Sequence, residues 1–195
     1  MSESEQKADL HRYLQEARDS LLWKLEGLSD YDVRRPLTPT GTNLLGLVKH
    51  LTYVELGYLC ATFGREHGEA LDDPEQDMYA AADESREEIV ARYRRAWAHC
   101  DAAIEELTLD TVGTVPWWPK ERAEVTFHHV LVRVLADAQH HAGHADILRE
   151  GLDGAVGWRR DNDALGTTDL DERAAYHAQL EEIARRADPS SAPPR

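Results

Sequence analysis

Residues 137–150 read DAQHHAGHADILRE, and this stretch places three histidines within an apolar segment of helical pattern. An α-helix turns by about 100° per residue, so side chains three or four positions apart share a face. If the segment is helical, Asp137, His141 and His144 face a common point. Imidazole nitrogen and carboxylate oxygen are ligands of zinc, nickel and ferrous iron. The stretch therefore predicts part of a metal site, although the same spacing also occurs in surface polar pairs.

A further ligand must come from another segment, and His50 is the candidate. It lies in the apolar run 44–54, LLGLVKHLTYV, with Leu47 and Val54 at the helical neighbour positions. This pattern indicates a ring that points inward. A lone histidine on an apolar face is more often a core residue than a ligand. Together with the histidine cluster at 137–144, however, His50 is interpreted as a ligand.

Two stretches resemble a known family. Residues 37–51, LTPTGTNLLGLVKHL, and 141–154, HAGHADILREGLDG, are similar to the signature segments of the DinB-like family, in particular its uncharacterised and mostly actinobacterial branch. That family is related to the mycothiol-dependent maleylpyruvate isomerases. The resemblance spans about residues 10–153. It implies an all-α fold, a four-helix bundle in which one residue of the second helix and two of a later helix hold a metal.

The resemblance also implies which residues bind the metal. The second-helix histidine of the family corresponds to His50, and its later pair corresponds to Asp137 and His141. Relatives often carry glutamate where this chain has Asp137, and the shorter side chain reaches less far. The third ligand is therefore either Asp137 or His144. Zinc is the expected metal, with nickel and iron as alternatives, and mycothiol is the low-molecular-weight thiol that the family implies.

Three functions are compatible with these residues. The first is a metal-dependent enzyme, a thiol S-transferase or isomerase that acts on a small electrophile, because a cation lowers the pKa of a thiol or water bound to it. The second is a non-catalytic metal- or ligand-binding bundle, in which His50, Asp137, His141 and His144 together close the site as in structural zinc. The third is a metal-dependent hydrolase with the same ligands.

A ligating imidazole usually donates its second N–H to a nearby acceptor. Glu55, Asp146 and Glu150 are the acidic candidates for this role in the sequence. For each of them, an exposed carboxylate or a helix-end ion pair is an equally good interpretation. No residue other than the metal ligands is assigned to catalysis.

Composition limits the class of protein. The chain has 195 residues, a formal net charge of −15 and 42% hydrophobic residues, which predicts one domain over residues 1–187 and a disordered tail over 188–195. The negative charge argues against nucleic acid as a partner. The absence of a long apolar run and of a secretion signal argues against a membrane and for a cytoplasmic location. Cys60 and Cys100 are expected to be reduced core thiols.

The helical periodicity predicts the individual elements. Ser85 and Glu88 form a capping-box pattern, Thr42 is a helix cap, and Gly151 and Gly154 are stop signals. A last amphipathic helix packs either on the bundle or on a second subunit, so a homodimer stays open. Trp117 and Trp118 lie in a proline-containing link and either cap the bundle or form a pocket wall. His128 and His129 are expected in another layer of the bundle than the metal site. The expected helices span about residues 7–28, 42–63, 85–107, 123–149 and 169–186.

Overall fold

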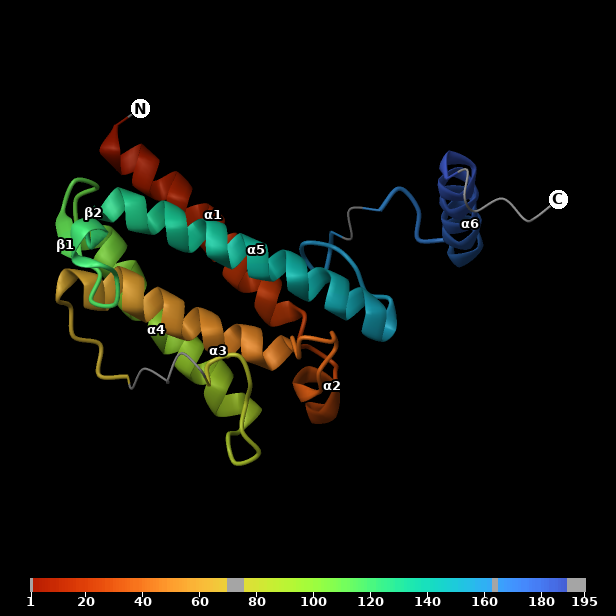
Figure 1. Cartoon of the computed structure of the whole chain (residues 1–195), viewed down its shortest axis with the longest axis horizontal. Helices are drawn as coiled ribbons and strands as arrows, with labels where there is room; N and C mark the ends of the chain where they lie inside the picture. Colours follow the sequence, from red (N-terminus) through yellow and green to blue (C-terminus); the bar gives the residue numbers. More distant parts are fainter. Residues whose placement is uncertain (1, 70–75, 163–164, 189–195) are drawn as a thin grey trace.

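The computed structural model describes residues 2–69, 76–162 and 165–188, so the predicted tail lies outside the described residues from 189 onward. Four long helices form a bundle (Figure 1), in which α1 packs on α5 and α4, and α3 packs on the same two helices. The predicted all-α bundle is confirmed. The four helices are α1 (Glu3–Trp23), α3 (Leu44–Glu55), α4 (Arg86–Glu106) and α5 (Phe127–Asp153).

The first helix begins and ends earlier than predicted. Ser2 caps it, since its hydroxyl accepts a hydrogen bond from the Glu5 backbone N–H while the Glu5 carboxylate accepts one from the Ser2 N–H. The chain then turns at Gly27, whose φ of 75° suits glycine. A five-residue helix, α2 (Asp30–Arg34), follows in the segment that was expected to be irregular.

Helix α3 carries the first candidate ligand, and its start is fixed by Asn43 rather than by the predicted Thr42. The Asn43 side chain accepts a hydrogen bond of 2.8 Å from the Gly46 N–H. Gly46 allows a close approach, because a Cβ there would lie 2.0 Å from the Met78 carbonyl oxygen. The segment around Met78 is therefore held against α3, one turn before His50. Beyond its end the helix continues as a π turn, η1 (Leu56–Cys60), and a 3-10 turn, η2 (Ala61–Phe63).

Helix α4 begins as predicted, because the Ser85 hydroxyl accepts a hydrogen bond from the Glu88 N–H. The prediction that the next helix starts at Ala123 is wrong. A short antiparallel pair precedes it, and the backbone of 124–126 bonds to a neighbouring strand instead of to a helix. Helix α5 then starts at Phe127, capped by Thr126, and reaches Asp153. The pair consists of β1 (Val112–Thr114) and β2 (Glu124–Thr126), with η3 (Lys120–Arg122) between them.

A buried ionic network joins three helices inside the bundle. Arg18 of α1 and Glu55 of α3 are both fully buried, and their side chains approach to 2.6 Å. The Tyr93 hydroxyl of α4 donates a 2.9 Å hydrogen bond to Glu55. Arg18 also contacts the half-buried Asp101 at 2.7 Å. The apolar core of the bundle includes Leu14, Leu21, Leu45, Leu51, Leu59, Ala96, Cys100, Phe127 and Val134.

The last helix, α6 (Leu170–Ala187), lies apart from the bundle in Figure 1. Its apolar side chains are exposed, for example Leu170 at 74% and Tyr176 at 62%. Of the two predicted placements, the one on the bundle is therefore wrong. The segment after Gly154 stays close to α1, where Gly157 and Trp158 accept hydrogen bonds from Lys24 and Trp23, and α6 lies beyond it. Among the described residues, no helix combines the length and the apolar character that crossing a bilayer requires.

Candidate metal centre

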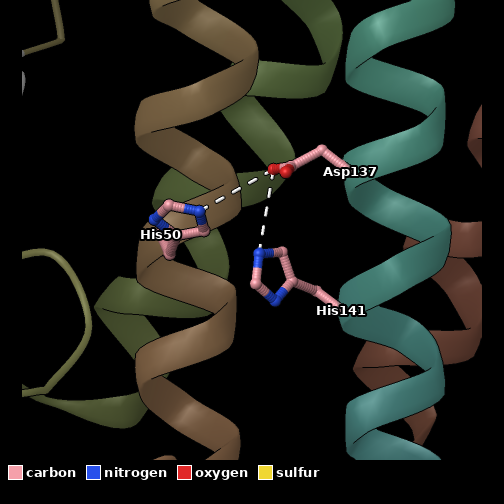
Figure 2. A group of neighbouring side chains, drawn as sticks. All are labelled: His50, Asp137 and His141. Atoms are coloured by element: carbon pink, nitrogen blue, oxygen red, sulfur yellow. Dashed lines mark ion pairs between the residues drawn. The ribbon is translucent and has the colours of Figure 1, made fainter.

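Three of the four predicted ligands converge between two adjacent helices (Figure 2). His50 projects from α3, and Asp137 and His141 project from α5, one turn apart. The Asp137 Oδ2 atom lies 3.7 Å from His50 Nε2 and 3.8 Å from His141 Nε2. The three ligand atoms all lie within 4.8 Å of one another. The helical spacing in α5 and the packing of α3 on α5 together produce this arrangement.

The donor set fits a small divalent cation. Asp137 Oδ2 is buried without a hydrogen-bond partner in the described part of the chain, and its distances to the two imidazoles exceed those of N–H···O bonds. A buried carboxylate oxygen without a partner is costly. Ligand atoms of a tetrahedral zinc site, each about 2.1 Å from the metal, are roughly 3.4 Å apart. A small inward movement of the three side chains would therefore complete a metal site.

The electrostatics favour the protonation state that a ligand needs at Asp137 and His141, whereas His50 has to release a proton when it binds a metal. Burial lowers the pKa of His141 to about 4, so this imidazole is neutral at neutral pH. Burial raises the pKa of Asp137, but His50 and His141 lower it more, and the carboxyl stays ionised. Burial lowers the pKa of His50, yet the carboxylates of Asp137 and Asp77 raise it above its usual value. The centre thus combines an anionic oxygen with imidazole nitrogens.

Asp77 is a site residue that the sequence did not reveal. Its carboxylate is 3% exposed and lies 2.8 Å from His50 Nδ1. An N–H at Nδ1 that donates to Asp77 leaves the lone pair of Nε2 directed toward Asp137 and His141. Asp77 lies in a polar loop without periodicity, 27 residues after His50. The loop meets α3 at Gly46, and the Asn43 side chain also donates a 3.2 Å hydrogen bond to the Met78 carbonyl oxygen.

The other predicted partners lie elsewhere. His144 is exposed and is outside the converging group, with its Nδ1 atom 3.4 Å from the Nδ1 atom of His141. Glu55 belongs to the buried ionic network around Arg18. Asp146 pairs with Lys24 at 2.5 Å, and Glu150 lies 4.0 Å from Arg173. Of the two interpretations of these carboxylates, the structure favours the ion pair over a role in orienting a ligand.

An open pocket of about 800 Å³ adjoins the centre. Asp137 lines it, and so do Arg133, His128 and His129, which precede Asp137 on α5. His128 and His129 lie about two turns before Asp137, outside the metal group, and the pocket extends along α5 from them to Asp137. The Trp118 ring lies 6.2 Å from the His129 ring. The proline-containing link thus packs beside this pocket.

The two tryptophans of this link share a hydrogen-bond acceptor. The indole N–H groups of Trp117 and Trp118 point to the Tyr58 hydroxyl oxygen, at 3.4 and 3.2 Å. Gly57 makes room for them, because a Cβ there would meet the Trp117 ring at 2.9 Å. The aromatic cluster of Tyr58, Trp117 and Trp118 thereby joins the link to η1 at the end of α3.

A comparison with known protein families matches the part of the chain that carries the candidate site. The family model described as mycothiol-S-transferase matches residues 9–154. The match begins within α1 and ends at the glycine that follows α5, so it contains His50, Asp137 and His141, and it leaves out α6. No curated protein matched the chain.

Proposed function

Because this chain belongs to the mycothiol-S-transferase family, we propose that it transfers the sulfur of a low-molecular-weight thiol, mycothiol, to a small electrophile at a divalent metal. His50, Asp137 and His141 are the proposed ligands, and zinc is the proposed metal. The observation that carries the proposal is the buried Asp137 Oδ2 atom, which finds no hydrogen-bond partner among the described residues and faces two imidazole Nε2 atoms. Three protein ligands leave a coordination position open, as catalytic sites require.

A divalent cation supplies one piece of chemistry here, since it lowers the pKa of a thiol that reaches it. The protein side chains supply the rest. Asp137 contributes the negative charge that holds the cation, and Asp77 holds the His50 ring in one tautomer. The thiol loses its proton to solvent, its sulfur forms a bond to the electrophilic carbon, and the leaving group departs with the electron pair of the broken bond. The open pocket beside Asp137 is the proposed entry for the electrophile.

Cobalt substitution tests this function. We expect the visible spectrum of the cobalt protein to change when mycothiol is added, but not when an analogue with a hydroxyl in place of the thiol is added. The zinc protein should then accelerate the reaction of mycothiol with a chromogenic electrophile. A closed four-coordinate cobalt spectrum that thiol does not alter would contradict the proposal and favour a non-catalytic binding protein.

Asp77 provides a second test of the ligand arrangement. Asp77→Ala is expected to weaken zinc binding by about 10- to 100-fold, because the His50 ring loses the acceptor that fixes its tautomer and orientation. Asp77→Asn keeps an oxygen acceptor and should lose less affinity. The measurement is competition with a chelating dye at pH 7. Equal zinc affinity in wild type and Asp77→Ala would show that this hydrogen bond does not support the site.

A further inference from the structure

Arg133 is the charged group in the pocket whose role the metal centre does not explain. It lies one helical turn before Asp137 on α5, so the two side chains share a face. Both line the same pocket. A group bound to Arg133 would therefore lie next to the proposed metal.

Two aromatic rings hold the Arg133 guanidinium in place. Its central carbon lies 5.1 Å from the centre of the Tyr58 ring and 5.3 Å from that of Trp118. These rings are fixed relative to each other, because the Trp118 indole N–H donates to the Tyr58 hydroxyl. Cation–π contacts of this kind orient a guanidinium without occupying its N–H donors. The two rings therefore hold the guanidinium at the pocket without occupying its N–H donors.

The N–H donors of Arg133 are available to a ligand. Within the described part of the chain, its guanidinium makes no hydrogen bond or ion pair. Arg12 provides the contrast: it stacks on Tyr13 at 4.1 Å, but it also pairs with Asp9 at 3.3 Å and Glu16 at 3.5 Å. An arginine fork matches a carboxylate in a bidentate pair, and this pair is among the strongest hydrogen-bonded contacts. Arg133 has the donors for such a pair and lacks the internal acceptor.

The surroundings of Arg133 favour an anion on a chain that otherwise repels anions. The formal net charge is −15, yet Asp137 is the one carboxylate among the described residues that line this pocket. A cation bound at Asp137 would neutralise that charge. The polar lining also contains Thr126, His128, His129 and His140, and the histidines offer further N–H donors.

We propose that Arg133 is a subsite for the carboxylate of the electrophile, so that the substrates of this chain are small carboxylic acids. The inference rests on the proposed function, because it names the substrate class of the same site. The carboxylate pairs with the Arg133 fork against the Tyr58 and Trp118 rings. The electrophilic carbon of the same molecule then lies toward Asp137 and the thiol sulfur.

Calorimetric titration with benzoate and with its neutral isostere benzamide tests the subsite on the full chain as isolated. We expect wild type to bind benzoate about tenfold or more tightly than benzamide, since charge-assisted hydrogen bonds contribute about 1.5–3 kcal/mol. Arg133→Gln should abolish this preference, and Arg133→Lys should keep part of it. Arg12→Gln is the matched control, and it should behave as wild type.

Three results would overturn the inference. The first is equal binding of benzoate and benzamide by wild type, and the second is an unchanged benzoate affinity in Arg133→Gln. The third is a benzoate affinity that persists in Arg133→Gln but is lost when the metal is removed by a chelator, which would place the carboxylate on the metal. The titrations need neither thiol nor turnover. Benzoate selectivity without thiol transfer would therefore refute the proposed function alone, and thiol transfer without an effect of Arg133→Gln would refute the subsite alone.

Discussion

Replacement of His141 by alanine is expected to reduce bound zinc from about one equivalent per chain to almost none, because one of three protein ligands is lost. His50→Ala should have the same effect from the opposite helix. The helical content should stay close to that of wild type, since both rings lie in partly exposed positions at the bundle surface. Elemental analysis of the untagged proteins, with circular dichroism on the same samples, measures both quantities.

His144→Ala is the matched control for this expectation. It removes an imidazole three residues further along α5, outside the converging group. We expect this variant to keep its zinc, with an affinity within about threefold of wild type, as is usual for surface substitutions. A loss of zinc as complete as in His141→Ala would make His144 a ligand, and it would favour the closed four-ligand site of a structural metal.

Replacement of Glu55 by alanine is expected to lower the free energy of unfolding by about 3–5 kcal/mol, because it leaves the fully buried Arg18 without its principal counter-charge. The Glu55 carboxylate accepts hydrogen bonds from Arg18 Nε and Nη2 and from the Tyr93 hydroxyl. Asp101 engages Arg18 Nη1 and cannot replace all three bonds. Urea unfolding, followed by circular dichroism, measures the loss.

An exposed ion pair serves as the control for Glu55. Glu181 pairs with Arg185 at 3.0 Å on α6, where both side chains are more than half exposed. Glu181→Ala should change stability by about 0.5 kcal/mol or less, because solvent screens such pairs. If Glu55→Ala were as mild as Glu181→Ala, the buried network would not contribute to stability in the way described.

Helical periodicity explains how much of the fold was predictable. The apolar pattern identified every helix of the bundle, and the spacing of Asp137 and His141 placed both on one face of α5. The ends of the helices were harder to predict from the sequence. Residues 124–126 were expected at the start of the helix 123–149, but they pair with Val112–Thr114, a partner that the local pattern does not reveal. The placement of α6 depends on the length and path of the preceding loop, which periodicity does not report.

The candidate ligands could be predicted from the sequence, but the residue that orients His50 could not. His50 was interpreted as a ligand because a histidine in an apolar helical run occurs in the same chain as the histidine cluster at 137–144. Asp77 has no local signal, since its role depends on the approach of a loop to Gly46. Glu55 was one of three candidate acceptors for the second N–H of a ligating imidazole. Its partner is Arg18 instead, because at five residues from His50 it points to the other side of α3, toward α1.

Anomalous diffraction at the zinc absorption edge, on crystals of the zinc-loaded protein, tests the metal centre most directly. We expect one peak per chain, about 2.0–2.2 Å from His50 Nε2, Asp137 Oδ2 and His141 Nε2. The absence of a peak there after zinc loading would contradict the proposed centre. So would a peak held by His140 and His144 on the exposed side of α5.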